Sequence, residues 1–303
     1  MENRRTAGGF VVSPPGRLRL GSRRYDLSHR SLVMGILNRT PDSFYERHFS
    51  IDDALERAEQ IAAEGGEVVD VGGVKAGAGP PVSVAEEIDR VCPVVNAVSS
   101  RFDVAVSVDT YRSPVAAAAL DAGASLINDI SGLSDPETLP TVSAAGASIV
   151  ITHMQGEPRV PHLEPRYRNL VSEVVGFLAD RAALADAGGV DAEHVVVDPG
   201  LDLGKTYAQS LVLVRELSQL MVIGSVVLLS ASHKGFLGSV APLKVDERHE
   251  ATMACVAYGF ARGARLFRAH SVAETVRVCR TMEGILTADA SDPWVSRYDP
   301  DAG

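Results

Sequence analysis

The sequence predicts a single α/β domain, a TIM (β/α)8 barrel preceded by a short N-terminal β-hairpin. Short apolar runs rich in Val and Ile recur along the 303 residues, and each is followed by a polar loop and a longer, Ala-rich segment with helical periodicity. This alternation is typical of parallel strands joined by helices. About eight such units are present, which is the number that closes a barrel.

The expected domain covers residues 17–288, with a flexible Gly/Pro-rich arm at 1–16 and a flexible tail at 289–303. Near its start, Leu18, Leu20 and Tyr25 alternate with polar residues around a Gly21-Ser22 turn, which predicts the hairpin. The hairpin is expected to plug the floor of the barrel. The eight strands are expected near residues 33–37, 68–71, 104–108, 125–127, 148–152, 195–197, 226–229 and 265–267.

Helix starts support this arrangement. Ser83 with Glu86, and Ser271 with Glu274, have the spacing of capping boxes. Ser113-Pro114 places a proline at a first helical position.

Charge and cysteine content limit the classes of partner. A net charge of -10 and a pI near 5.3 argue against nucleic acid or an anionic membrane surface, because both attract basic chains. The chain has three cysteines without CxxC spacing, so neither a disulfide framework nor a zinc cluster is expected. We therefore expect a cytoplasmic protein with small-molecule substrates.

A polar side chain follows every predicted strand. Because the C-terminal strand ends of a TIM barrel meet at one mouth, these residues are expected to share one cleft. Any one of them can instead be a turn residue or a helix N-cap, but the presence of the pattern in all units favours a shared site. The set is Asn38, Asp70, Asp109, Asn128, His153, Asp198, Ser230 with Lys234, and Arg268 with His270.

These residue types suit a polar heterocycle that carries phosphate. Asp109, Asp198 and Asn128 can hydrogen-bond to the amide and amino edge of a fused ring. Arg268 and His270 can surround a diphosphate, and the oxygen of Asn38 can hold Mg²⁺. Zinc-hydrolase spacing is absent from the sequence, and the Gly pair after the second strand lacks the GxGxxG pattern of dinucleotide folds.

An ordered series of motifs resembles the dihydropteroate synthase family from about residue 32 to about residue 270. The motifs are Met34-Gly-Ile-Leu-Asn-Arg-Thr-Pro-Asp-Ser-Phe44, Asp70-Val-Gly-Gly73, Ser107-Val-Asp-Thr110, Leu126-Ile-Asn-Asp129, His153-Met154, Asp198-Pro-Gly200 with Gly204-Lys205, Ser232-His-Lys234 with Phe236-Leu-Gly238, and Phe267-Arg-Ala-His270.

The resemblance implies a barrel, usually a homodimer, that joins 6-hydroxymethyl-7,8-dihydropterin diphosphate to p-aminobenzoate and releases pyrophosphate in folate synthesis. The implied pterin contacts are Asp109, Asn128, Met154, Asp198, Lys234 and Arg268, with Lys234, Arg268 and Asp109 implied as the catalytic set. Asn38, Arg268 and His270 resemble the diphosphate residues, and Asn38 resembles the Mg²⁺ ligand.

Departures from the family pattern gather on the p-aminobenzoate side. Residues 74–79 read Val-Lys-Ala-Gly-Ala-Gly where the family commonly has Glu-Ser-Thr-Arg-Pro-Gly. Residues 45–48 read Tyr-Glu-Arg-His in place of Ser-Asp-Gly-Gly, and Arg39 replaces a small apolar residue. His233 stands where Arg normally precedes the lysine, which removes a bidentate donor. Asp202-Leu203 replaces a Gly-Phe pair, and Ser271 replaces an aspartate.

Three functions remain open at this point. The first is transfer of the pterin to p-aminobenzoate or a related aryl amine. The second is a divergent paralogue that binds a pterin or its diphosphate with little or no synthase activity. The third, a pterin-dependent methyl carrier on the same barrel, is disfavoured by the synthase-like Thr40-Pro-Asp-Ser-Phe44 loop.

Overall fold

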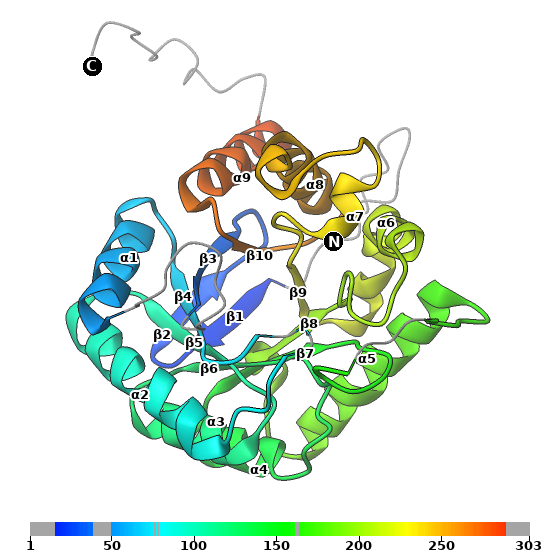
Figure 1. Cartoon of the computed structure of the whole chain (residues 1–303). Helices are drawn as coiled ribbons and strands as arrows, with labels where there is room; N and C mark the ends of the chain where they lie inside the picture. The colour runs from blue at the N-terminus through cyan, green and yellow to red at the C-terminus, as the bar shows by residue number, and fades with distance from the viewer. Residues whose placement is uncertain (1–15, 39–49, 76, 78, 161–163, 289–303) are drawn as a thin grey trace, which may run out of the picture.

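The computed structural model describes residues 16–38, 50–75, 77, 79–160 and 164–288. Eight parallel strands form a closed barrel in the order β10-β3-β4-β5-β6-β7-β8-β9, and helices surround it (Figure 1). The strands are β3 Leu32–Asn38, β4 Val68–Gly72, β5 Ala105–Asp109, β6 Leu126–Asp129, β7 Ser148–Thr152, β8 Val195–Asp198, β9 Val226–Leu229 and β10 Leu266–Ala269. The predicted fold class is confirmed, and each strand begins and ends within two residues of its expected position.

The outer layer is formed by the helices that follow the barrel strands. They are α1 Ile51–Ala63, α2 Val84–Arg101, α3 Ser113–Asp121, α4 Thr138–Ala144, α5 Leu170–Ala187, α6 Tyr207–Arg215, α7 Gly235–Gly238, α8 His249–Ala261 and α9 Val272–Thr287, with 3₁₀ helices η1 Ala192–His194, η2 Leu217–Ile223 and η3 Val245–Glu247. None of the described helices is long and apolar enough to cross a membrane.

The predicted helix starts are partly confirmed. Ser83 caps α2 by accepting a hydrogen bond from the Glu86 backbone N–H at 3.1 Å, which is one half of the predicted capping box. Pro114 lies in the first turn of α3, as expected. The capping box at Ser271 is wrong, because Ser271 is the N-cap residue of α9 by backbone position but its side chain makes no capping hydrogen bond.

Strand residues alternate between two apolar layers. Outward-facing side chains such as Val33 and Leu37 pack against the helices, whereas inward-facing Leu32 and Met34 pack inside the barrel. The hairpin strands β1 Arg17–Leu20 and β2 Arg23–Asp26 join this inner layer.

The hairpin closes the N-terminal end of the barrel. Leu18, Leu20 and Leu27 are at most 1% exposed and belong to the same cluster as the inward-facing strand residues. The hydroxyl of Ser148 at the start of β7 donates to the Arg19 carbonyl. The hairpin therefore acts as the plug that the sequence predicts, and the C-terminal end of the barrel is left for a ligand site.

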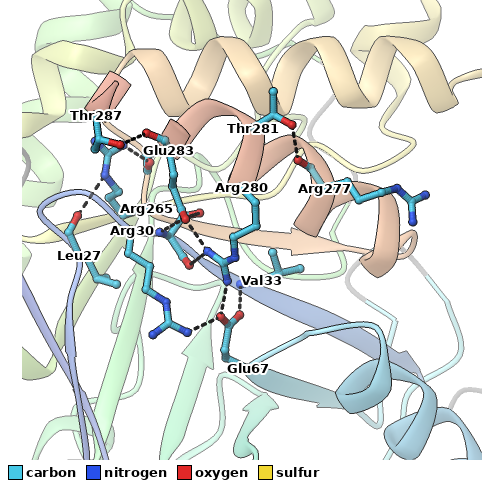
Figure 2. A network of polar contacts seen from close by, with 12 residues as sticks. Leu27, Arg30, Val33, Glu67, Arg265, Arg277, Arg280, Thr281, Glu283 and Thr287 are labelled. Atoms are coloured by element: carbon cyan, nitrogen blue, oxygen red, sulfur yellow. Dashed lines mark hydrogen bonds and ion pairs between the residues drawn. The ribbon is translucent and has the colours of Figure 1, made fainter. Parts of the chain in front are cut away.

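A polar network joins β3 to α9 at the plugged end (Figure 2). Glu67 accepts hydrogen bonds from Arg30 at 2.9 Å, Arg280 at 2.8 Å and the Val33 backbone N–H at 2.9 Å. Glu283 accepts from the backbone N–H and the hydroxyl of Ser31. The network holds the seam where the first and last barrel strands meet.

Candidate active site at the barrel mouth

Strand ends gather the predicted polar residues at one mouth. Asp109 and Asn128 are paired neighbours in the β5–β6 register, and Asp198 ends β8. Arg268 of β10 reaches across to Asp109, with 3.1 Å between Nη2 and Oδ2. Lys234 follows β9 and lies close enough to Asp198 for the two charges to shift each other's pKa.

Arg268 is oriented by a buried carboxylate that had no assigned role in the sequence. Its Nε donates to Asp70 Oδ2 at 2.6 Å, and Asp70 is 0% exposed. The other Asp70 oxygen accepts from the Ser107 hydroxyl at 2.6 Å. The Asn128 side-chain amide lies 3.4 Å from Asp70 Oδ2. The sequence feature that points to a role for Asp70 is its position as an acid inside the apolar run Val68-Val69-Asp70-Val71, since a buried carboxylate requires a partner.

One guanidinium therefore serves two carboxylates. Burial raises the pKa of Asp109 to about 7, the nearby charge of Asp70 acts in the same direction, and Arg268 opposes them. The two carboxylates raise the pKa of Arg268 above its usual value despite burial. Asp109 is thus balanced between its neutral and ionised forms near neutral pH, which suits a group that hydrogen-bonds to a heterocycle.

Asp198 and Lys234 are two further charged groups of the mouth, and each affects the pKa of the other. Burial raises the pKa of Asp198, and Lys234 partly offsets this. Burial lowers the pKa of Lys234, and Asp198 and then Asp202 oppose that shift. Asp198 Oδ1 accepts from the Gly200 N–H at 2.7 Å, and Lys234 Nζ donates to the Leu201 carbonyl at 2.8 Å. Both side chains are therefore fixed by the loop that follows β8.

A buried lysine ties the β7 loop to the β8 loop. Lys205 Nζ contacts His153 Nδ1 at 2.9 Å and donates to the carbonyls of His153 at 3.1 Å and Leu203 at 2.9 Å. Burial lowers the pKa of Lys205 to about 7 and that of His153 to about 3. His153 is therefore a neutral packing residue, and Met154, which follows it after β7, is half-buried. Lys205 belongs to the Gly204-Lys205 motif of the family resemblance, but it was not among the predicted site residues.

The predicted diphosphate residues lie beside Arg268. His270 Nδ1 is 3.1 Å from the Ser232 hydroxyl, and Arg57 donates to the His270 carbonyl at 2.7 Å. Burial lowers the pKa of His270 to about 4, and the charges of Arg268, His233 and Arg57 act in the same direction. At neutral pH His270 is a hydrogen-bonding group, and Arg268 supplies the positive charge.

Asn38 ends β3 with an exposed side chain whose amide oxygen lies over the backbone of Gly72. A Cβ built on Gly72 would be 3.2 Å from that oxygen, so glycine leaves it room. Within the described ranges, no three acidic, histidine or cysteine side chains gather as a metal cage. A single oxygen donor fits Mg²⁺, which keeps several waters and is often carried by substrate phosphates.

The loop after β4 is held by arginines from three other segments. Arg90 donates to the Gly73 carbonyl at 2.9 Å, and Arg112 donates to the Val82 carbonyl at 2.8 Å. Arg159, from the β7 loop, donates to the carbonyls of Lys75 and Pro80. This loop lacks the arginine that the family pattern has there. Instead, the guanidinium groups of arginines from other segments of the chain hold its backbone carbonyls.

Backbone strain marks the same side of the mouth. Arg159, Asp202 and His233 have φ values of 67°, 62° and 54°, in the left-handed region that non-glycine residues seldom occupy. Asp202 and His233 are two of the positions at which the sequence departs from the family pattern. Arg39 and residues 45–48, the other departures near β3, lie outside the described residues.

The fold and the mouth together define a (β/α)8-barrel protein with buried charged and polar side chains at its C-terminal strand ends, where proteins of this fold class have their active sites. A family model described as pterin binding enzyme matches residues 34–270. The chain belongs to this family.

Its relatives include proteins with two different descriptions. The chain is 40% identical over 264 residues to the Mycobacterium leprae (strain TN) protein named inactive dihydropteroate synthase 2, covering 84% of this chain and 91% of the relative. It is 36% identical over 266 residues to the dihydropteroate synthase of Escherichia coli (strain K12), covering 87% and 94%. The structure of Xanthomonas albilineans dihydropteroate synthase with 4-aminobenzoic acid superposes with a TM-score of 0.83 at 33% identity, covering 91% and 100%.

Proposed function

We propose that the mouth binds 6-hydroxymethyl-7,8-dihydropterin diphosphate and that the protein transfers the pterin-methyl group to p-aminobenzoate or a related aryl amine with release of pyrophosphate. The observation that carries the proposal is the set Asp109, Asn128, Asp198, Lys234 and Arg268, which come from the ends of five strands, β5, β6, β8, β9 and β10, at one barrel mouth.

In this proposal Asp109, Asn128 and Asp198 accept from and donate to the amide and amino edge of the pterin. The planar guanidinium of Arg268, held by Asp70, lies against the ring system. The CH₂–O bond ionises and the departing pyrophosphate takes the electron pair. The amine nitrogen then forms the C–N bond and loses a proton. Fixed dipoles and charges that stabilise these developing charges account for the catalysis, and no covalent protein nucleophile is required.

Arg268 and His270 are proposed to contact the diphosphate, with His270 as a neutral hydrogen-bond partner. A Mg²⁺ ion carried by the diphosphate would take the Asn38 oxygen as a ligand and neutralise the charge of the leaving group.

We further propose that the protein is a cytoplasmic homodimer. Cys92, Cys255 and Cys279 are all free thiols, which suits a reducing compartment. The dimer rests on the family resemblance, and light scattering of the purified protein tests it.

The experiment is a product assay with purified protein, the pterin diphosphate, Mg²⁺ and a panel of aryl amines that includes p-aminobenzoate. A pterin–amine conjugate formed with stoichiometric pyrophosphate supports the proposal. Absence of any conjugate across the panel overturns it.

A second candidate is a protein that binds the pterin diphosphate without transfer. The strained and clamped second-substrate side favours it, as does the description of the M. leprae relative. Tight binding of the pterin diphosphate together with a negative product assay would support this candidate.

A further inference from the structure

We propose that Asp202 determines acceptor specificity. Its fixed carboxylate lies on the acceptor side of the mouth and selects an aryl amine that carries no carboxylate. This inference rests on the proposed function, because it concerns the second substrate of the same site.

The backbone at Asp202 is held in an unfavourable conformation. Its φ of 62° suits glycine, the residue that the family pattern commonly has there. An aspartate persists in such a conformation when surrounding contacts fix it, and outliers of this kind gather at functional sites.

Hydrogen bonds fix both carboxylate oxygens. The Ser210 hydroxyl donates to Asp202 Oδ1 at 3.0 Å, and the Phe236 backbone N–H donates to Oδ2 at 3.2 Å. The Asp202 backbone N–H donates in turn to the Ser210 oxygen at 2.9 Å. The negative charge therefore has a defined position between the β8 loop and the segment that begins at Lys234.

This charge acts on Lys234. Burial lowers the pKa of Lys234, and the charges of Asp198 and then Asp202 oppose that shift; Asp202 also acts, more weakly than Asp198, on Lys205. Lys234 thus already has two carboxylates as electrostatic partners. A benzoate entering beside it would meet the repulsion of Asp202 instead of an unshared positive charge.

Neighbouring donors on this side are directed at backbone carbonyls. Arg248 donates to the His233 carbonyl at 2.9 Å, and His233 Nδ1 is 3.0 Å from the Val245 carbonyl. Arg159 contacts the carbonyls of Lys75 and Pro80. Since these groups already have acceptors, a neutral amine, such as an ester or amide of an aminobenzoate or an unsubstituted aniline, suits this side better than an acid.

The test compares p-aminobenzoate with its methyl ester, which differ in charge but share the amine and ring. Each is titrated calorimetrically into protein saturated with 6-hydroxymethyl-7,8-dihydropterin and magnesium pyrophosphate, a combination that cannot turn over. The proteins are wild type, Asp202→Asn, Asp202→Gly and the control Asp103→Asn. Asp103 lies at the plugged end, where it pairs with Arg23 of the hairpin.

We expect wild type to bind the ester about tenfold more tightly than the acid, and both Asp202 variants to reduce that ratio about tenfold. Asp103→Asn should leave the ratio unchanged. The inference is overturned if wild type binds the acid as tightly as the ester or binds neither, if the ratio is unchanged in the Asp202 variants, or if only Asp202→Gly shifts it. The last result would assign the effect to loop freedom.

The same titration distinguishes failure of the proposed function from failure of the inference about Asp202. Failure of the dihydropterin to bind in the first step contradicts the proposed function. If the dihydropterin binds normally but the ratio of the affinities for the acid and the ester is the same in wild type and the Asp202 variants, only the role of Asp202 is contradicted.

Discussion

Arg268 of β10 and Asp70 of β4 form a buried ion pair across the barrel mouth, with 2.6 Å between Nε and Oδ2. Asp70 has no exposed side-chain surface, and Arg268 is 17% exposed. The pair fixes the plane of the guanidinium while its Nη2 reaches Asp109. Removing Arg268 would leave the buried Asp70 without this cation, and neutralising Asp70 would leave Arg268 with Asp109 as its one ion-pair partner in the described part of the chain.

Asp70→Asn should therefore lower the free energy of unfolding by about 3 kcal/mol, the lower end of the range for breaking a buried pair from one side. The shift in the urea midpoint measures this change. Ser107→Ala removes only a hydrogen bond from the other carboxylate oxygen and should cost about 1 kcal/mol. Equal stability of Asp70→Asn and wild type would show that the ion pair has no structural role.

Binding of the dihydropterin should strengthen as the pH rises through 7. The ring donates N–H groups to the ionised form of Asp109, whose pKa burial raises to about 7. The ionised fraction of Asp109 grows about tenfold between pH 6 and pH 8, and affinity should grow with it. Below pH 7, binding to the ionised form releases a proton. Calorimetry across this range, in buffers of different ionisation enthalpy, measures both effects. Asp109→Asn should bind weakly and without this dependence, and an unchanged slope in the variant would assign the titration to another group.

Arg159→Ala should loosen the loop after β4. Two charge-assisted hydrogen bonds to Lys75 and Pro80 are lost, so amide hydrogen exchange in residues 73–82 should accelerate about 5- to 30-fold, which corresponds to roughly 1–2 kcal/mol. Arg166→Ala is the matched control, because Arg166 lies in the same connection but pairs only with exposed Glu164 among the ion pairs of the described residues. Equal exchange in the two variants would contradict the clamp.

Glu67→Ala should destabilise the fold without weakening dihydropterin binding. The Val33 N–H loses its acceptor and two arginines lose their partner at the plugged end, at a cost of about 1–3 kcal/mol. Thermal unfolding measures the loss. Glu274→Ala breaks an exposed pair with Arg277 and should change stability by no more than about 0.5 kcal/mol. A loss of affinity in folded Glu67→Ala would mean that the two ends of the barrel are coupled.

The strands could be located from sequence because their outward-facing residues must be apolar to pack against helices. Val33 and Leu37 carry that signal, and so does the run around Asp70. The role of Asp70 could not be read in the same way. Its partner Arg268 lies 198 residues further along the chain, and only barrel closure brings the two together. Lys205 was overlooked for a similar reason, since its acceptors belong to two different loops.

Local spacing was an incomplete guide to helix capping. Ser83 and Ser271 have the same sequence pattern, but only the Ser83 side chain accepts a hydrogen bond from the first turn of its helix. Ser50 with Asp53 and Thr206 with Gln209 form full capping boxes that the sequence analysis did not identify. A residue pattern does not fix the backbone and side-chain conformation of the N-cap residue, on which the capping hydrogen bond depends.

Direct calorimetric titration of the pterin diphosphate with Mg²⁺ tests whether the mouth recognises this ligand. Wild type should bind one molecule per chain, and Asp109→Ala and Asp198→Ala should each weaken binding by about tenfold or more, because buried partner groups lose a hydrogen bond. Asp103→Asn should bind as wild type does. An absence of heat with wild type, or equal affinity in all four proteins, would contradict recognition of this ligand by the mouth.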